Sequence, residues 1–310
     1  MFKARRRVPA EFIYLDPHAA PEDQGLGISG ERLNHLQGTD ALLLVVRAFD
    51  DPSVPHVKEA VDPFRDAESM LFELTFADLE ILERRLARLE TDLKGAKTSE
   101  RDTLRKNQAL ISRIQEALES GTAIRDQIFD RDEARLLEGY RFLTAKPFIL
   151  VVNVGEDQIA EIPSLEARFS ARWAGAQQRV AALCGQLEME LAQMAPNDEL
   201  EFRQSMGLGE SGMIRMVGLS QDVLDLTTFY TCDVKEVRAW TIAVGTTAGK
   251  AAGKIHSDFE RGFIRAEVVA YDDLTRLGNM AAVRRHGLLR QEGKNYVVAS
   301  GDVVNILFNV

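Results

Sequence analysis

The chain has 310 residues, of which 45% are hydrophobic and 28% are charged, and its formal net charge is −10. The length exceeds that of most single domains and the hydrophobic fraction supplies a core, so we expect two or three folded domains and exclude a disordered chain. The negative charge argues against a generally cationic nucleic-acid-binding protein, although a local basic patch is compatible with it.

The two cysteines, Cys184 and Cys232, are too few for a disulfide framework and lack metal-ligand spacing, which favours a reducing, cytoplasmic environment. The longest apolar runs, 41–46 and 148–152, are much shorter than the roughly 20 residues of a membrane-spanning helix. The basic N-terminus runs into a strand pattern without the apolar core of a secretory leader. We therefore expect neither a membrane protein nor a secreted one.

The first third of the chain alternates between strand and helix patterns. We predict a short apolar strand at 12–15, a helix at 31–36 and a buried strand at 41–46. The run at 148–152 is apolar at every position, which predicts a central strand, and 180–183 predicts another strand before a helix at Glu188. This order is typical of an α/β fold with a parallel sheet.

An apolar pattern typical of paired helices interrupts the α/β domain. Leucines recur at alternating spacings of three and four residues from Leu79 to Leu93, and apolar residues resume the pattern from Leu104 to Leu118. This predicts an inserted antiparallel coiled-coil hairpin, whose second helix is capped by the segment 98–101. A purely structural arm and an arm that binds a protein partner both fit the pattern.

Beyond about Asp222 the pattern changes to short strands. We predict strands at 239–244, 263–269, 296–299 and 303–308 around one helix near 273–285. A separate small α+β domain is indicated. The predicted domains are 1–68 with 146–221 for the α/β domain, 69–145 for the helical insertion and 222–310 for the last domain.

Asp16 follows the first predicted strand, where P-loop hydrolases hold a magnesium ion and sense the terminal phosphate of the nucleotide. It begins the sequence Asp-Pro-His-Ala, in which Ala19 replaces the glycine of the Asp-x-x-Gly switch of such proteins. The switch is therefore degraded. A structural role for Asp16, such as capping the next turn, fits the same sequence.

Asn153 ends the predicted central strand and Glu156 follows it by three residues. Open α/β sheets bind their ligands at this end of the strands. An Asn side chain can brace the loops there and approach a purine, and an acidic side chain can select the base by accepting hydrogen bonds from ring donors. An ordinary turn at a strand end is the alternative.

Two glycine-rich segments resemble nucleotide-binding motifs without their context. The segment 25–30 matches G-x-G-x-x-G but does not lie tightly between a strand and its helix, and 249–254 has three residues rather than four between its glycines and is followed by Ile255. The histidines have no metal-ligand spacing: they are His18, His35, His56, His256 and His286. The spacing of these glycines and histidines therefore predicts neither a nucleotide-binding motif nor a metal site.

The segment 222–310 closely resembles the C-terminal TGS-type domain of the YchF proteins, an Obg-related family of P-loop nucleotide hydrolases. The resemblance rests on KEVRAWTI at 235–242, AGKIHSDFERGFIRAE at 252–267 and EGKNYVV at 292–298. It implies a ubiquitin-like β-grasp fold that contacts RNA or the ribosome. The candidate RNA-binding face consists of Lys254, His256, Phe259, Arg261 and Arg265, unless these residues only build and solvate the fold.

A looser resemblance to the same family covers the rest of the chain. It implies that His56, on a flexible loop, assists hydrolysis and that Asn153 and Glu156 read the base, with Glu in place of the Asp of guanine-specific members. It also implies that the segment Cys184, Gly185 and Gln186 packs on the base. The nucleotide would be ATP or GTP with Mg²⁺, held indirectly by Asp16; without nucleotide binding no cofactor is expected.

Family members carry a strand and a G-x-x-x-x-G-K-[ST] phosphate loop before the segment equivalent to residues 1–3. Because that loop supplies most of the electrostatic clamp on the phosphates, we expect these residues alone to have lost or severely impaired hydrolysis. We also expect an exposed apolar sheet edge.

The resulting hypothesis is an incomplete P-loop NTPase sheet that acts as an interaction module for the ribosome or RNA, with no DNA or membrane partner. The alternative is a fragment of an active ATP- or GTP-hydrolysing switch of translation, whose phosphate loop lies upstream of Met1.

Overall fold

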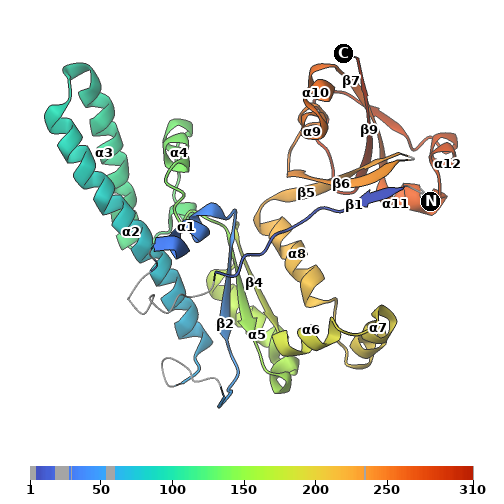
Figure 1. Ribbon diagram of the computed structural model, residues 1–310, viewed down its shortest axis with the longest axis horizontal. Helices are drawn as coiled ribbons and strands as arrows, with labels where there is room; N and C mark the ends of the chain where they lie inside the picture. The colour runs from blue at the N-terminus through green and yellow to red at the C-terminus, as the bar shows by residue number, and fades with distance from the viewer. Residues whose placement is uncertain (1–4, 18–27, 29, 54–59, 234, 310) are drawn as a thin grey trace. The chain divides into compact units, whose positions relative to one another are not determined.

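The computed structural model describes residues 5–17, 28, 30–53, 60–233 and 235–309. Figure 1 shows how the helices and strands follow one another along the chain. The chain divides into two compact units, one of Leu15–Val223 and the other of Met1–Tyr14 together with Leu224–Val310. Both combine a sheet with helices, which agrees with the predicted α/β and α+β character.

A parallel sheet forms the centre of the first unit. Its strands are β2 (Leu42–Arg47), β3 (Phe148–Asn153) and β4 (Gln178–Leu183), in the order β2-β3-β4. β3 pairs with a neighbour on each side, and its residues are buried from Phe148 to Val152. The central strand predicted at 148–152 is therefore confirmed, as is the strand predicted at 180–183.

The strand predicted at 41–46 is confirmed as β2, but only one of its faces is buried. Leu42, Leu44 and Val46 are buried, whereas Leu43 and Val45 are 41% and 48% exposed. Successive side chains of a strand point to opposite faces of the sheet. Within the described residues β2 is an edge strand, so apolar side chains are exposed at this edge of the sheet.

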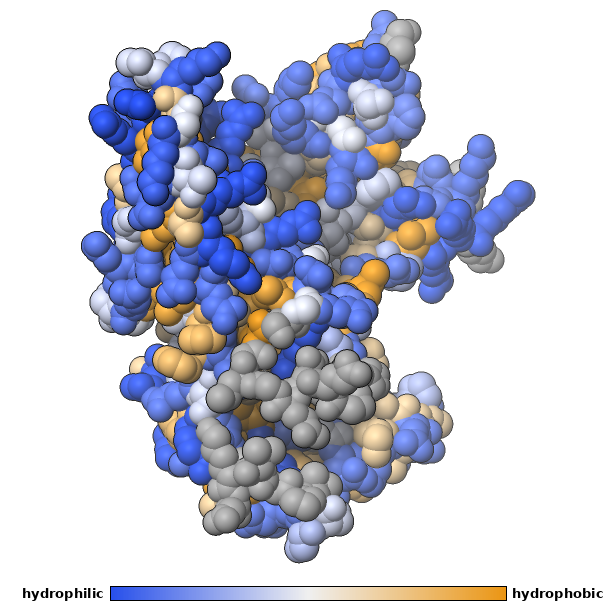
Figure 2. Space-filling model, turned by 60° about the vertical axis from the view of Figure 1, so that its left-hand side comes forward, coloured by the Kyte–Doolittle hydropathy of each residue, from blue (hydrophilic) through white to orange (hydrophobic). Residues whose placement is uncertain are grey.

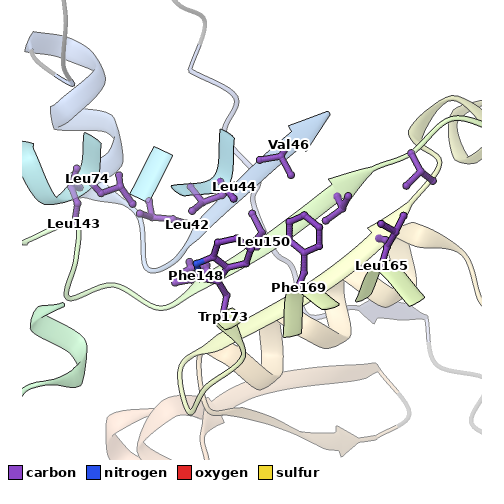
Figure 3. Packing of buried hydrophobic residues seen from close by; sticks show 14 of the residues in the cluster. Leu42, Leu44, Val46, Leu74, Leu143, Phe148, Leu150, Leu165, Phe169 and Trp173 are labelled. Atoms are coloured by element: carbon purple, nitrogen blue, oxygen red, sulfur yellow. The ribbon is translucent and has the colours of Figure 1, made fainter. Parts of the chain in front are cut away.

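The core of the first unit lies between the sheet and helices α2 (Pro63–Gly95) and α5 (Ile162–Trp173). Figure 3 shows Leu150 of β3 and Phe169 of α5 close together within this cluster. The ring centroids of Phe64 and Phe169 are 4.0 Å apart, and those of Phe169 and Trp173 are 5.3 Å apart. Full burial of one such side chain contributes about 1.5–3 kcal/mol, so these rings hold both helices on the sheet.

The predicted helical hairpin consists of α2 and α3 (Thr98–Glu119), which lie side by side (Figure 1). Its apolar seam is completely buried at Leu82, Leu89, Ile111 and Ile114. The prediction that the segment 98–101 caps the second helix was wrong. The helix begins at Thr98, and its N-cap residue is Lys97, which makes no side-chain cap hydrogen bond.

Asp78 anchors the middle of α2 to the segment that leads back to the sheet. Its side chain is fully buried and accepts hydrogen bonds from the N–H of Leu143 (2.9 Å), the N–H of Thr144 (2.7 Å) and the hydroxyl of Thr144 (2.7 Å). Burial raises the pKa of Asp78, and these hydrogen bonds oppose the rise. A buried carboxylate is tolerated where several donors satisfy it, so this contact fixes the base of the hairpin.

Shorter helices complete the first unit. They are α1 (Gly30–Gly38), η1 (Ile124–Asp126), α4 (Arg131–Glu138), η2 (Glu156–Glu161), α6 (Gly185–Leu191), α7 (Pro196–Ser205) and α8 (Gly212–Val223). The helix predicted at 31–36 is confirmed as α1. The helix predicted at Glu188 begins three residues earlier, directly after β4.

The second unit has a mixed six-stranded sheet in the order β1-β6-β5-β9-β7-β8. Its strands are β1 (Arg6–Val8), β5 (Leu226–Cys232), β6 (Glu236–Ala243), β7 (Phe263–Ala270), β8 (Arg290–Glu292) and β9 (Asp302–Phe308). Its helices are α9 (Ala248–Ile255), α10 (Ser257–Arg261), α11 (Tyr271–Leu277) and α12 (Met280–Arg285). The predicted strands at 239–244, 263–269 and 303–308 are confirmed, although β5 and β8 were not predicted.

Two further predictions in this unit were wrong. The segment 296–299 is not a strand and makes only an isolated bridge between Val297 and Thr247. The single helix predicted near 273–285 is two helices, because Gly278 ends α11 with a φ of 79°. Glycine adopts this left-handed conformation without the steric cost that a Cβ imposes.

The strand predicted at 12–15 does not form. This segment has no regular structure, and Ile13 and Leu15 are 83% and 65% exposed. Instead, β1 pairs in parallel with β6, from Arg6 opposite Glu236 to Val8 opposite Arg238. The sequence predicts that residues 1–68 belong to the α/β domain. The backbone pairing of β1 places residues 6–8 in the sheet of the second unit instead.

Hydrophilic side chains cover most of the face shown in Figure 2, with hydrophobic ones scattered between them. Within the described part of the chain, no helix combines the length and the apolar composition that crossing a membrane requires.

Candidate functional site

A cavity of about 630 Å³ lies at the carboxyl ends of β2 and β3. The segment 48–51 after β2, the segment 153–158 at the end of β3, and Cys184 and Gln186 after β4 line this cavity. Parallel strands bring their carboxyl ends to the same edge of a sheet, where open α/β folds bind ligands. Three segments that are far apart in the sequence therefore meet at one place.

Backbone hydrogen bonds hold these segments in register beyond the strands. The N–H of Ala48 donates to the carbonyl of Asn153 (2.8 Å), and the N–H of Val154 donates to the carbonyl of Leu183 (3.0 Å). The side-chain oxygen Oδ1 of Asn153 accepts a hydrogen bond of 2.9 Å from the N–H of Gly185. Asn153 thus braces the turn after β4, as the sequence predicted for an Asn at this place.

Gly185 lies close to the Asn153 side chain. A Cβ at this position would be 3.1 Å from Oδ1 of Asn153 and 3.4 Å from its Nδ2. The first distance is tighter than an ordinary van der Waals contact, so a larger residue would displace Asn153. The glycine permits the close approach on which the hydrogen bond depends.

Carboxylates dominate the charge of the cavity. Asp50, Asp51, Glu156 and Asp157 line it, and among its described lining residues none is Lys or Arg. Glu156 is exposed and begins η2. A carboxylate accepts hydrogen bonds but donates none when ionised. The lining therefore suits a ligand group that donates hydrogen bonds, and it is less suited to an anionic group.

Asp51 is ionised more readily than an ordinary aspartate. Its Oδ1 accepts hydrogen bonds from the Ser53 hydroxyl (2.6 Å) and the Ser53 N–H (2.9 Å). These two bonds lower the pKa of Asp51, with a smaller contribution from the charge of Arg47. The negative charge beside the cavity therefore persists in mildly acidic solution.

Phe49 is a lining residue that the sequence analysis missed. Its ring is half-buried and lies 5.6 Å from the guanidinium carbon of Arg47. An aromatic side chain offers a flat apolar surface to a planar ligand. The strand-end rule that identified Asn153 would have found Phe49 if it had been applied to the end of β2.

Only some of the residues that the sequence predicted for this site line the cavity. Asn153, Glu156, Cys184 and Gln186 line the cavity, and Gly185 contacts Asn153. Asp16 is exposed in an irregular segment and is not among the lining residues. Ala19 and the candidate catalytic His56 lie outside the described residues, as do most of the glycine-rich segment 25–30 and His18.

In the described part of the chain, Asp16 belongs to no group of three or more His, Cys, Asp or Glu side chains placed to hold a metal ion, and no such group is found elsewhere in it.

The second candidate face lies around α9 and α10. Lys254, His256 and Arg265 are exposed. The guanidinium of Arg261 pairs with Asp258, and His256 Nδ1 accepts a hydrogen bond from the N–H of the same aspartate. These contacts reduce the positive charge of the predicted face, so only part of it is available to a phosphate.

Phe259 is a poor candidate for stacking on a base. Its ring is half-buried and packs on Phe308 at a centroid distance of 4.1 Å. It also lies 6.0 Å from the ring of His256. Phe259 therefore supports the fold, and the exposed ring of His256 remains for a ligand. The glycine-rich segment 249–254 lies within α9 rather than in a loop, which agrees with its rejection as a phosphate-binding loop.

Comparison with known proteins gives similarity along the whole chain. The model of the family YchF-GTPase_C, described as a protein of unknown function, matches residues 226–309. The chain is 38% identical to "Ribosome-binding ATPase YchF" of Bacillus subtilis, over 99% of this chain and 84% of that protein. It is 39% identical to the protein of the same name from Haemophilus ducreyi, over 97% of this chain and 81% of that one.

A solved structure shows the same similarity in three dimensions. The "Structure of the Schizosaccharomyces pombe YchF GTPase" matches with a TM-score of 0.81 and 30% identity, over 98% of this chain and 82% of that one. The chain thus shares with that protein an α/β fold of P-loop NTPase-like architecture.

Proposed function

Because this chain belongs to the YchF family, we propose that it holds the base of an adenine nucleotide in the cavity at the ends of β2 and β3 and acts on the ribosome. The observation that carries the proposal is the meeting of Asn153, Glu156 and Cys184 around one cavity. The names of the relatives, which include ATPase and ribosome binding, support both halves of it.

The cavity suits a purine in size and chemistry. Its volume of about 630 Å³ lies within the usual range of small-molecule sites. The ring of Phe49 packs against the face of the base, and Glu156 accepts hydrogen bonds from donors on its edge. Asn153 acts as a positioning residue, since it holds the turn at Gly185.

The phosphates gain little from the same residues. The lining carboxylates repel phosphate oxygens, and the described lining offers no cation to compensate. Residues 1–310 therefore bind the base more strongly than the phosphates. Hydrolysis by them is slow, because phosphoryl transfer depends on a cationic clamp around the γ-phosphate.

Calorimetric titration with adenosine and with ATP and Mg²⁺ tests whether the base contributes more to binding than the phosphates do. We expect the two dissociation constants to agree within about threefold, since each tenfold difference requires about 1.4 kcal/mol of phosphate contacts. The base contact is tested with Glu156→Ala, which should weaken both ligands alike, against the control Glu161→Ala outside the lining. ATP binding ten times tighter than adenosine would contradict the weak phosphate contacts.

The second half of the proposal concerns the TGS-type face of the second unit. We expect Lys254, His256, Arg261 and Arg265 to contribute contacts to RNA phosphates on the ribosome. The charge-reversal variant Lys254→Glu, Arg261→Glu and Arg265→Glu should lose cosedimentation with ribosomes, and added salt should weaken the binding of the unmodified chain.

A matched control reverses three other exposed arginines of the same unit, on α11 and α12: Arg276, Arg284 and Arg285. This control variant has the same net charge as the first and should keep cosedimenting. Equal loss in both variants would show that overall charge, rather than the proposed face, governs ribosome binding.

A second candidate function is an ATP-hydrolysing switch of which these residues are the larger part. The relatives named ATPases extend beyond the aligned region, since the chain spans 84% of the Bacillus subtilis protein. Mass spectrometry of the protein purified from its own cells distinguishes the two. An N-terminal extension containing G-x-x-x-x-G-K-[ST] would favour the active switch.

A further inference from the structure

The outer edge of β2 carries backbone groups that the sheet does not use. At its two ends, the N–H groups of Leu42 and Ala48 donate to carbonyls on the β3 side, at 2.9 Å and 2.8 Å. Since every second residue of a strand directs its N–H and C=O to the same side, the even-numbered residues of β2 face β3. Leu43 and Val45 therefore direct both groups away from β3, and among the described residues these groups have no hydrogen-bond partner.

The opposite edge of the same sheet, formed by β4, is capped instead. Gln178 exchanges hydrogen bonds with Gly175 through both of its backbone groups, at 3.4 Å and 3.3 Å. The N–H of Ala182 donates to Oε1 of Glu166 (2.6 Å), and the carbonyl of Ala182 accepts a hydrogen bond from Arg215 (3.2 Å). Groups that occupy an edge in this way prevent it from pairing with another chain. A further strand can therefore pair at β2 but not at β4.

The side chains of β2 favour such a pairing. No charged residue and no proline lies in the segment 41–46, although charges and proline are the usual protection of an edge strand. Leu43 and Val45 are exposed, on the face of the sheet opposite the core that contains Leu44. An apolar segment of this length with free backbone groups is a template for strand addition.

This edge is complementary to itself. If two copies of β2 lie antiparallel about a two-fold axis at Leu44, Leu43 of each copy lies opposite Val45 of the other. Both residues direct their N–H and C=O outwards, so each such pair exchanges two hydrogen bonds. The four side chains lie on one face of the sheet, where apolar cross-strand neighbours stabilise the pairing. A shift by one residue would place Leu43 opposite an inward-directed residue and lose these bonds.

We propose that residues 1–310 form a two-fold dimer through antiparallel pairing of β2, which joins the sheets of two copies into one. Because the β4 edges are capped, the assembly closes at two copies and does not grow into a fibre. Two short strands bury less than a standard interface of about 1,600 Å², so we expect a dissociation constant of about 10 µM. The inference depends neither on the proposed nucleotide site nor on ribosome binding.

Sedimentation equilibrium of the full chain at increasing concentration measures the association. We expect the mass to rise from the chain mass of 34.6 kDa to twice that value, without larger species. The net charge of −10 makes two copies repel each other, so added salt should strengthen the dimer by screening this repulsion. A mass that stays at 34.6 kDa about 100-fold above the expected dissociation constant, or open-ended aggregates, would overturn the proposal.

Two matched substitutions locate the contact. Val45→Lys places a charge on the outer edge of β2, and Val244→Lys places the same charge at a valine that is 64% exposed in the second unit. We expect Val45→Lys to raise the dissociation constant at least about tenfold, although it reduces the negative charge of each copy, and Val244→Lys to leave it unchanged. Thermal unfolding verifies that both variants are folded. Equal dissociation constants in the two variants would place the contact elsewhere and overturn the proposal.

Cysteine cross-linking tests the register. Opposite residues of a hydrogen-bonded antiparallel pair have Cα atoms about 5.5 Å apart, within the range that a disulfide spans. A mixture of the variants Leu43→Cys and Val45→Cys should form a disulfide-linked dimer under mild oxidation. Each variant alone should do so at least about tenfold more slowly, because like positions lie farther apart. The unmodified chain, which has Cys184 and Cys232, controls for background. Equal rates in the mixture and in the single variants would overturn the proposed pairing.

Discussion

Oδ1 of Asn153 and the backbone N–H of Gly185 are joined by a hydrogen bond of 2.9 Å, which ties the end of β3 to the turn after β4. Asn153 lines the proposed base site, and Gly185 lies between two of its other lining residues, Cys184 and Gln186. We expect Asn153→Ala to release this turn and to weaken adenosine binding at least about tenfold, the loss of a hydrogen bond in a partly desolvated site. Isothermal calorimetry measures the change.

The control for this prediction is Asn305→Ala, which removes an exposed amide of β9 that bonds to Glu267 at 3.1 Å. It should leave adenosine binding unaltered. Unchanged affinity in Asn153→Ala would rule out a positioning role for the amide.

Gly185→Ala tests the same contact from the other side. The added Cβ would lie 3.1 Å from Oδ1 of Asn153, so the amide must move by a few tenths of an ångström. We expect adenosine affinity to fall about threefold, less than after removal of the amide. Gly218→Ala in α8 is the matched control, since a Cβ there meets nothing within 4 Å; it should leave binding unchanged and stabilise the helix slightly.

Asp78→Asn addresses the base of the helical hairpin. In the unmodified chain, the two carboxylate oxygens of Asp78 accept hydrogen bonds from the N–H groups of Leu143 and Thr144. In the asparagine variant an NH₂ group replaces one of these oxygens and cannot accept the bond. We expect a loss of about 1–3 kcal/mol in the free energy of unfolding, the cost of a buried unsatisfied group. Urea unfolding at neutral pH, followed by the fluorescence of Trp173 in a Trp240→Phe background, measures it. The exposed substitution Asp102→Asn on α3 should cost nothing comparable.

The pKa of Asp78 adds a pH dependence to this prediction. Because burial raises the pKa in the folded state above 3.8, the folded chain binds the proton more tightly than the unfolded one. The contribution of this group to stability therefore decreases as pH rises from about 3.8 through the raised folded pKa. Asp78→Asn should lack that slope, and an unaltered slope in the variant would assign the effect to other groups.

Glu188 and Arg203 give a pH dependence of the opposite sign. Burial opposes ionisation of Glu188, but the hydrogen bonds from Arg203 and from Gly212 outweigh it and lower its pKa. Stability from this pair is present above the unfolded pKa of about 4.5 and is lost as pH falls through the lowered folded value. Arg203→Met should cost about 2 kcal/mol at neutral pH and less in acid.

Urea unfolding at a series of pH values measures this difference. Arg172→Met removes an exposed ion pair with Glu68, whose length of 2.6 Å equals that of the ion pair between Arg203 and Glu188. This substitution should cost less than about 1 kcal/mol at every pH. A cost for Arg203→Met that does not change with pH would assign its effect to packing instead of charge.

The sequence predicted the parts of the molecule that depend on local pattern. The continuous apolar run at 148–152 identified the central strand, and the rule that ligands bind at the carboxyl ends of parallel strands led to Asn153 and Glu156. The spacing of leucines identified the hairpin. In each case the side chains themselves carry the signal.

The error at 12–15 has a different cause: the missing information lay in a partner segment. An apolar stretch such as 12–15 can pair only where a neighbouring strand edge is available, and the exposed Ile13 shows that none is used. β1 instead pairs with β6 through backbone groups, which leave no trace in side-chain periodicity.

Helix α2 belongs to two hydrophobic clusters at once. Ala67 and Leu74 pack in the core of the sheet, whereas Leu82 and Leu89 pack against α3, and Asp78 lies between the two sets. No glycine or proline interrupts the helix from Phe64 to Lys94, so it continues unbroken on both sides of Asp78. A tilt of about 5° at the sheet would move the end of the helix, roughly 25 Å beyond Asp78 at 1.5 Å per residue, by about 2 Å. A small tilt of α2 on the sheet is thus magnified at the tip of the hairpin.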